Sequence, residues 1–463
     1  MNSSNTQQSA FVADDPNKAV KRLIWLYFFL LIYEGAFRKW FLPSLANPLL
    51  IVRDPVVILI YMLSLSRGTF PESSFIGWIT GFGMATFFVS LFTGVGNFVV
   101  SVYGWRTDFL HLPLIFVMQK ILNPDDVKQI CKWLLITAVP MGILVMVQFR
   151  SDPLAWVNKG VGLGEGGQLD VGFGKIRPPG TFSFTNGLAN YVALVGGCLL
   201  YAVVNKTYYP KWLLFVAAPS LILMVIASGS RATVSSVVIS IIVLALVVLR
   251  RPTLVGESFK FVLLALPGLW LVTNMSIFQE GNMVLTSRFG DSAGGGVQHG
   301  IIERALNDYL DGLYAIADTP FFGYGLGVGT NAAAGLLGGE RGFLLAEGEW
   351  ARVVKEGGVI FGYGFLLLRV AICFYLGWVA LAASERRRDP NPLGLLIFSA
   401  CVLLVLNGQL GQPTALGFAV FGGGLCLAAA NEGVEDLPES SVSLVPLRRG
   451  MRGRSVFAEA LHN

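Results

Sequence analysis

Four arginines lie in polar connections between long apolar segments of the sequence: Arg177, Arg231, Arg288 and Arg304. Guanidinium groups bind carboxylate and phosphate oxygens through paired hydrogen bonds, so arginines gathered in one place favour an anionic ligand. A carboxylate, Glu347, precedes the next apolar segment, where it could accept a hydroxyl proton or pair with the arginines. These residue types indicate an anion site with a carboxylate beside it.

The composition identifies the class of protein that must position these residues. Hydrophobic residues make up 54% of the 463 residues and charged residues only 14%. Soluble domains carry about 25% charged residues, whereas a protein that crosses a membrane several times has the balance seen here. Lipid offers no partner to backbone polar groups, so the spans must be helices. We therefore expect an all-α, polytopic integral membrane protein.

Twelve apolar segments are long enough, or nearly so, to cross a membrane as helices, which takes about 20 residues. They lie near residues 22–41, 48–67, 74–94, 104–122, 129–148, 184–204, 211–228, 231–249, 257–276, 357–383, 392–410 and 413–431. Polar residues interrupt the second and fourth segments: Arg53, Asp54, Arg106, Asp108 and His111. The expected parts are two tails, nine spans that enclose a long connection, a second long connection and three last spans: 1–21 and 432–463, 22–276 with 149–184, 277–356, and 357–431.

Lysines and arginines crowd the tails and the even-numbered connections, as at Lys18, Lys128, Arg250 and Arg386. Positive charge is biased toward cytoplasmic connections, so both long connections are expected on the other side. The arginines of these connections oppose the bias, and an external anionic ligand would explain them. Arginine side chains that extend along the membrane surface are the alternative.

Charged residues inside the apolar segments need partners, because each costs about 2.5–3.5 kcal/mol at mid-membrane on insertion scales. Glu34 and Arg38 are four residues apart, so they share a helix face and are expected to neutralise each other. Arg53 and Asp54 are expected to form a second group of this kind. We favour a structural role for both groups over a direct one.

The cysteines and histidines do not indicate a metal site. The five cysteines match no zinc or redox spacing, and we expect them to be small buried apolar residues: Cys131, Cys198, Cys373, Cys401 and Cys426. Only three histidines occur in the chain, so no metal is expected. The polar stretch NGQLGQP at 407–413 predicts a tight turn between the last two spans.

The first long connection ends in KIRPPGTFSFTNGLANY at 175–191. Pro178 and Pro179 fix an extended entry, and Gly180 allows the backbone to turn. Asn186 is expected to cap the following helix, which would hold Arg177 at the mouth of a span. In the same way, the short connection SGS is expected to place Arg231 at the start of a helix.

The second long connection contains a predicted amphipathic helix. Apolar residues recur every three or four positions through 300–318, with Arg304 near the start. The glycine-rich stretch 320–329 follows, but it lacks the Gly-Lys-Ser/Thr and the preceding strand of a phosphate-binding loop. We therefore expect no nucleotide there. Trp350, just before the tenth span, is expected to anchor the chain at the membrane interface.

Five motifs occur in order along the chain: RPPGTFSFTNGLANY, SGSRA, ERALNDY, PFFGYGLG and EGEWARVVKEGGVIFG. Together, over roughly residues 130–430, they resemble the O-antigen ligase and polysaccharide polymerase family of bacterial envelopes. The resemblance implies glycan transfer from a polyprenyl-pyrophosphate carrier at the periplasmic face of the inner membrane. In this family the reaction inverts the anomeric centre and needs neither metal nor cofactor.

The resemblance also implies roles for individual residues. Arg177, Arg231 and Arg304 would hold the pyrophosphate, and Arg288 is a nearby candidate that the family pattern fixes poorly. Glu347 stands where ligases of the family have a histidine, and it would take the acceptor hydroxyl proton or hydrogen-bond the acceptor sugar. This departure favours a polymerase of lipid-linked repeat units over a lipid A ligase.

Two alternatives remain open from the sequence. The same fold could act as a ligase toward a lipid or protein acceptor, or the chain could transport anionic lipid-linked sugars. Transporters place charged or broken helices near the bilayer midplane and often show an internal repeat, and no repeat is evident here. The expected partners are the lipid-linked glycan, membrane lipid and a chain-length regulator, with no nucleic acid.

Overall fold

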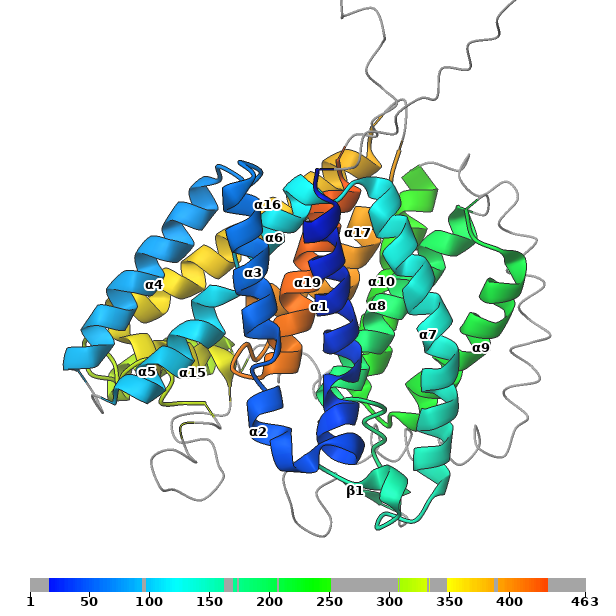
Figure 1. Ribbon diagram of the computed structural model, residues 1–463, viewed down its shortest axis with the longest axis horizontal. Coiled ribbons are helices and arrows are strands. Elements are labelled where there is room, and N and C mark those ends of the chain that lie inside the picture. The colour runs from blue at the N-terminus through cyan, green and yellow to red at the C-terminus, as the bar shows by residue number, and fades with distance from the viewer. Residues whose placement is uncertain are drawn as a thin grey trace, which may run out of the picture. The chain divides into compact units, whose positions relative to one another are not determined.

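The computed structural model describes residues 16–93, 97–161, 170–172, 175–205, 208–250, 307, 309–330, 333, 348–386 and 390–431. Within these ranges the chain is helical apart from one antiparallel hairpin, formed by β1 (Asp170–Gly172) and β2 (Lys175–Ile176) (Figure 1). This confirms the prediction of an all-α protein. The tails and the predicted span at 257–276 lie outside the described residues.

The first half of the chain forms most of the long helices. They are α1 (Lys18–Ala36), α3 (Arg53–Ser66), α4 (Ser74–Phe92), α5 (Phe98–Trp105), α6 (Leu114–Ile121), α7 (Pro124–Arg150), α8 (Thr185–Val204), α9 (Lys211–Ala227) and α10 (Arg231–Arg250). Short elements extend or join them: η1 (Phe37–Phe41), η2 (Pro43–Leu45), α2 (Ala46–Leu49), η3 (Arg106–Leu110) and η4 (Trp156–Asn158).

The second half begins with η6 (Ala315–Asp318) and continues with a series of joined helices. These are α15 (Glu349–Gly357), η7 (Gly358–Gly362), α16 (Tyr363–Ser384), α17 (Leu393–Ile397), η8 (Phe398–Val402), α18 (Leu403–Asn407) and α19 (Pro413–Ala429). The elements η1, η3, η7 and η8 are π-helical turns, which are rare and frequently occur at functional sites.

Six helical stretches among the described residues are long and apolar enough to cross a membrane: Pro43–Ser66, Ser74–Phe92, Pro124–Arg150, Thr185–Val204, Ala232–Arg250 and Glu349–Ser384. The chain therefore has the helices of a membrane protein, but the count of twelve spans is not confirmed. Three further apolar helices have only 10–17 residues. One reason is visible in the fourth predicted segment, where Pro113 lacks an N–H and separates η3 from α6.

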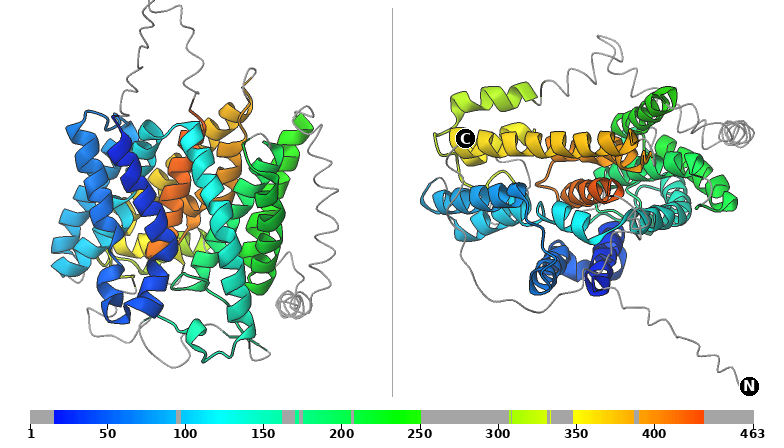
Figure 2. Two further views of the ribbon diagram at one scale, coloured as in Figure 1. Left: turned by 45° about the vertical axis from the view of Figure 1, so that its right-hand side comes forward. Right: turned by 90° about the horizontal axis from the view of Figure 1, so that it is seen from above.

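The bundle has two ends that are defined by the direction of its helices. We call the end where α8, α10 and α19 begin the loop end. The starts of α8 and α19 meet there, since Asn186 Nδ2 donates to Gln412 Oε1 at 3.4 Å. We call the opposite end the turn end. There, Asn431 Nδ2 donates to the carbonyl oxygen of Leu122 at 3.1 Å. In Figure 1 the loop end is at the bottom, and Figure 2 shows the same helices from two other directions.

Helix α19 runs through the middle of the bundle. Every one of its residues from Ala415 to Ala429 is buried, as expected for a helix that is apolar all round. Small residues let the neighbours come close: a side chain at Gly422 would meet Cys401 Cβ at 2.5 Å, and one at Gly424 would meet Met118 Sδ at 2.6 Å. Phe28 of α1 stacks on Phe421 with ring centroids 5.6 Å apart.

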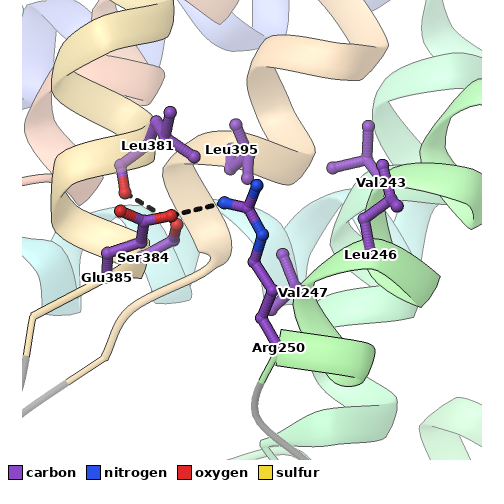
Figure 3. A pocket seen from close by; sticks show the side chains of 8 residues that line it. All are labelled: Val243, Leu246, Val247, Arg250, Leu381, Ser384, Glu385 and Leu395. Atoms are coloured by element: carbon purple, nitrogen blue, oxygen red, sulfur yellow. Dashed lines mark hydrogen bonds and ion pairs between the residues drawn. The ribbon is translucent and has the colours of Figure 1, made fainter.

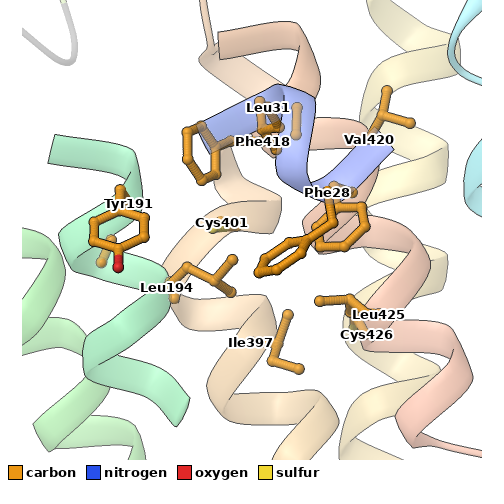
Figure 4. Close-up of a cluster of buried hydrophobic side chains, with 14 of the residues drawn as sticks. Phe28, Leu31, Tyr191, Leu194, Ile397, Cys401, Phe418, Val420, Leu425 and Cys426 are labelled. Carbon is orange, nitrogen blue, oxygen red and sulfur yellow. The ribbon is translucent and has the colours of Figure 1, made fainter. Parts of the chain in front are cut away.

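The five cysteines are all buried and free, which confirms the prediction that they are small apolar core residues. Cys401 and Cys426 belong to the cluster of aliphatic and aromatic side chains around α19 (Figure 4). Among the described residues, no group of three or more Asp, Glu, His or Cys side chains could hold a metal ion.

Candidate functional site

The structure describes two of the five residues predicted to form the site. Arg177 follows β2 at the loop end and is half-buried, and Arg231 is the first residue of α10 at the same end. Arg288, Arg304 and Glu347 lie outside the described residues. The segments that carry Arg177 and Arg231 thus reach one end of the bundle, as predicted.

The segment after Arg177 is tied to the helices by buried hydrogen bonds. Lys39 Nζ, which is fully buried, donates to the carbonyl oxygen of Gly180 at 2.6 Å, and Gln148 Nε2 donates to the same oxygen at 3.2 Å. Gln148 Oε1 accepts the Gly180 N–H at 2.8 Å. Gly180 has a φ of 60°, so the predicted turn at this glycine is confirmed. Arg177 is therefore attached to a rigid backbone.

The same segment lies directly on α1. A side chain at Gly35 would come within 2.5 Å of the backbone at Thr181 and Ser183, so only glycine permits this approach. Thr181 Oγ1 donates to the carbonyl oxygen of Ile32 at 2.6 Å. Asn186, by contrast, does not cap α8: the residue before the helix is Phe184, and no side chain caps it. That prediction was wrong because Asn186 is directed toward Gln412 instead.

A first ion cluster joins α1, η1, α3 and η3. Its members, Glu34, Arg38, Arg53, Asp54, Arg106 and His111, are all at least nine-tenths buried. Glu34 accepts from Arg53 Nε at 3.0 Å and lies 3.5 Å from Arg38 Nη1, which confirms the predicted Glu34–Arg38 pair. Arg38 reaches further, since its Nε donates to the carbonyl oxygen of Ala46 at 2.7 Å and its Nη1 to Ser183 Oγ at 3.0 Å.

Asp54 belongs to the η3 side of the first ion cluster rather than to Arg53. It accepts a hydrogen bond from Arg106 and lies 2.9 Å from His111 Nε2. The predicted Arg53–Asp54 group was therefore wrong, because Arg53 bonds Glu34 and donates from Nη2 to the carbonyl oxygen of Pro413 at 2.6 Å. Adjacent residues at a helix start point in different directions, and here each meets a different helix.

A second ion cluster joins η3, α15 and α16. Its members are Asp108, Glu349, Arg352, Glu356 and Arg369, none more than 4% exposed. Arg352 lies at the centre: its Nη2 is 2.9 Å from Asp108 Oδ1 and 3.0 Å from Glu349 Oε1, and its Nη1 is 3.0 Å from Glu356 Oε1. Arg369, with no exposed surface, lies 2.8 Å from Glu349 Oε1.

The turn after α18 supplies backbone partners to both ion clusters. Arg369 Nη2 donates to the carbonyl oxygen of Gly408 at 3.0 Å, and the Leu410 N–H donates to Glu349 Oε1 at 3.2 Å. The carbonyl oxygen of Pro413 accepts from Arg53, as described above. The predicted turn between the last two helices is present. The backbone N–H and carbonyl groups of this turn therefore supply hydrogen bonds to the side chains of both ion clusters.

The glycine-rich stretch binds a carboxylate of the chain itself. The N–H groups of Gly327 and Gly329 donate to the two carboxylate oxygens of Glu356 at 2.8 and 2.9 Å. Gly323, Gly325 and Gly327 all have positive φ angles, which let the backbone curve around the carboxylate. A phosphate-binding loop uses backbone N–H groups in the same way, but Glu356 occupies these donors.

Two other predicted elements of this region are partly described. Trp350 donates from Nε1 to the carbonyl oxygen of Leu406 at 3.1 Å, and its ring packs edge-on against Tyr309, 4.7 Å away; its position at the membrane interface stays a prediction. Of the predicted amphipathic helix, residue 307 and residues 309–318 are described and are helical. Leu313 and Tyr314 are 51% and 71% exposed.

Sequence reasoning missed Lys39 and most of the second ion cluster. The signal was present: Arg369 stands within the apolar segment 357–383, and an ionisable residue there is a candidate functional residue. A scan against models of known protein families finds no match, and a search of curated proteins finds none either. The resemblance drawn from the five motifs therefore stays a prediction.

Proposed function

We propose that the chain is a membrane glycosyltransferase that polymerises polyprenyl-pyrophosphate-linked oligosaccharide units into a cell-surface polysaccharide. In this proposal the chain crosses the bacterial inner membrane twelve times, and the loop end faces the periplasm. The proposal includes the ninth span that the sequence predicts at 257–276. The type of reaction is inferred from the family resemblance, and the loop end is the proposed position of the active site.

One observation carries the proposal. The segments that begin with Arg177 and Arg231 reach the same end of the bundle, and buried bonds from Lys39 and Gln148 make the first of them rigid. Arginines held in place bind the oxygens of a pyrophosphate without first losing side-chain and backbone freedom. Glu349, two residues after Glu347, is bonded into the second ion cluster at this end.

The chemistry follows from these roles. The acceptor hydroxyl oxygen attacks the anomeric carbon from the face opposite the pyrophosphate, and the carbon–oxygen bond to the carrier breaks with inversion. Glu347 takes the hydroxyl proton, and the carrier leaves with the electron pair as polyprenyl pyrophosphate. Arg177 and Arg231, with Arg304 and Arg288 as further candidates, stabilise the negative charge that develops on the leaving oxygens.

The test is a reconstituted reaction. Purified protein in detergent is given a polyprenyl-pyrophosphate oligosaccharide without nucleotide, and the lipid-linked products are separated by length. Longer glycans are expected, with Arg177→Ala, Arg231→Ala and Glu347→Gln each lowering the rate at least a hundredfold. Arg67→Ala is the matched control, because Arg67 is exposed at the turn end and donates to the backbone of Pro16. Normal polymer from all three variants would remove the proposed site.

Two outcomes of the same experiment favour the alternatives. Release of polyprenyl pyrophosphate only when a distinct lipid or protein acceptor is added would identify a ligase. A transporter is the second candidate because the π-helical turns η3 and η7 have buried charged residues in or beside them, which transporters use for substrate and ions. Movement of the intact substrate across vesicle membranes without turnover would identify that function.

A further inference from the structure

A groove opens at the turn end between α10, α16 and α17, away from both ion clusters (Figure 3). Its volume is about 240 Å³. The lining residues are Val243, Leu246, Val247, Arg250, Leu381, Ser384, Glu385 and Leu395. Nothing in the proposed glycosyl transfer uses this groove, so its role requires a separate explanation.

The groove is apolar along its length and charged at its mouth. Successive turns of α10 contribute Val243, Leu246 and Val247, and the facing helices contribute Leu381 and Leu395. In Figure 3 the Arg250 side chain extends from the end of α10 toward Glu385 at the end of α16. A hydrocarbon chain fits the apolar length, and a headgroup fits the charged mouth. A phospholipid combines these two parts.

The ion pair at the mouth is weakly held. Arg250 Nη1 lies 2.5 Å from Glu385 Oε1, but the two side chains are 67% and 51% exposed. Solvent screens such a pair, and pairs of this kind contribute little to stability. The Arg250 guanidinium can therefore exchange the carboxylate of Glu385 for another anion at small cost, unlike the buried arginines of the loop end.

The charge around the mouth selects an anion. In the sequence Arg251 directly follows Arg250, and Arg386, Arg387, Arg388 and Asp389 directly follow Glu385, so these two stretches carry five arginines against two carboxylates. Basic pockets between transmembrane helices on the cytoplasmic side bind anionic lipid headgroups. A zwitterionic headgroup would gain little from this excess of positive charge. The chemistry therefore favours an anionic phospholipid.

We propose that this groove holds an anionic phospholipid of the adjacent leaflet. One acyl chain lies along Val243, Leu246 and Val247, and the phosphate accepts hydrogen bonds from Arg250 in place of Glu385. The site needs only the orientation in which the turn end faces the cytoplasm. It does not depend on the chemistry proposed for the loop end.

Native mass spectrometry of the purified protein tests the site. The protein is given equimolar phosphatidylglycerol and phosphatidylcholine of the same chain length, and the retained lipids are counted. We expect at least a fivefold preference for phosphatidylglycerol. Arg250→Gln should abolish the preference, and Glu385→Gln should increase it, because Glu385 then no longer competes for the arginine. Arg67→Gln, at the same end on α3, should leave it unchanged.

Two results would overturn the proposal. Equal retention of both lipids by the wild-type protein would mean that the groove does not select an anion. An unchanged preference in Arg250→Gln would place the selective site elsewhere. Both substituted residues are exposed, so neither variant should misfold, and a single symmetric peak in size-exclusion chromatography checks this. Val247→Trp, which fills the groove, should reduce retention of both lipids.

Discussion

Basic residues lie at both ends of the bundle, but their burial and their ion-pair partners differ between the two ends. At the loop end Arg53, Arg352 and Arg369 are at most 4% exposed, and each bonds a buried carboxylate. At the turn end the Arg250 side chain is 67% exposed and meets a single exposed partner. Burial therefore turns Arg53, Arg352 and Arg369 into structural connections, whereas Arg250 remains a charge that is exposed to solvent.

The difference explains how basic residues can stand at the end that the charge bias assigns to the outside. The two ion clusters contain five arginines and five carboxylates, so their formal charges cancel, with His111 counted as neutral. The bias concerns charges that stay exposed near the membrane surface. Among the residues described above, Lys39 is a further buried cation that is not counted in this balance. It supports the segment that carries Arg177.

The largest effect is expected from Arg369→Leu. The change removes a buried cation from Glu349 and takes away the guanidinium donor of the carbonyl oxygens of Val405 and Gly408. Breaking a buried pair in this way costs about 3–5 kcal/mol. The free energy of unfolding, measured by detergent titration, should fall by this amount. Arg250→Leu is the matched control, with a loss of at most about 1 kcal/mol. Equal losses in Arg369→Leu and Arg250→Leu would show that arginines at the two ends contribute equally to stability.

Gly327→Ala should have the next largest effect. Gly327 has a φ of 86°, and a Cβ there would lie 2.4 Å from the carbonyl oxygen of Val100. Strain and displacement of this loop should cost about 2–3 kcal/mol and expose residues 323–330 to protease. Gly81→Ala in α4 is the control, since nothing lies within 4 Å of its added methyl group. Protection equal to wild type would show that the loop accepts a side chain at this position without being displaced.

Gly417→Ala tests the contact between α19 and the first ion cluster. The added methyl group would lie 2.0 Å from Arg53 Nη1, so the guanidinium must move away from Glu34. We expect a loss of about 1–3 kcal/mol. Much of that loss should disappear when Arg53→Gln is already present, because the clash with Arg53 is then removed and only the contact with Leu31 Cδ1 at 2.5 Å remains. A double-mutant cycle measures this coupling, and additive losses would contradict it.

The smallest effect is expected from Lys128→Gln. Lys128 Nζ lies 2.9 Å from Asp125 Oδ1 on the first turns of α7, and the Asp125 side chain is 77% exposed. Pairs of this kind on a helix surface contribute about 0.2–0.5 kcal/mol. The same detergent titration should barely detect the change. A loss above 1 kcal/mol would show that charged residues of the turn end also contribute substantially to the free energy of unfolding.

The class of protein and several local features were predictable from the sequence. Composition alone indicates the apolar helices, and the four-residue spacing of Glu34 and Arg38 predicts their pair. The turn at 407–413 and the buried cysteines follow from polarity and residue type. Each of these properties depends on residues close in sequence or on the solvent that a residue prefers.

The ion clusters were not predictable because their partners are far apart in the chain. Arg352 bonds Asp108 across 244 residues, and no local pattern connects the two. Arg53 has an acidic neighbour in Asp54 but bonds Glu34, since tertiary packing decides which helix each side chain meets. The π-helical turns that redirect the helices, such as η3 at Arg106–Leu110, also have no simple sequence signature.

The long separation between Asp108 and Arg352 has a consequence for how the protein is made. Ribosomes add about 5–20 residues per second, so Asp108 is in place roughly 12–50 s before Arg352 is synthesised. During that interval the carboxylate lacks the partner that it has in the finished bundle. It must stay near water, accept a proton or be sheltered by the insertion machinery. The late helices therefore complete the early half of the protein, and a chain that stops before residue 349 should be recognised as unfinished by membrane quality control.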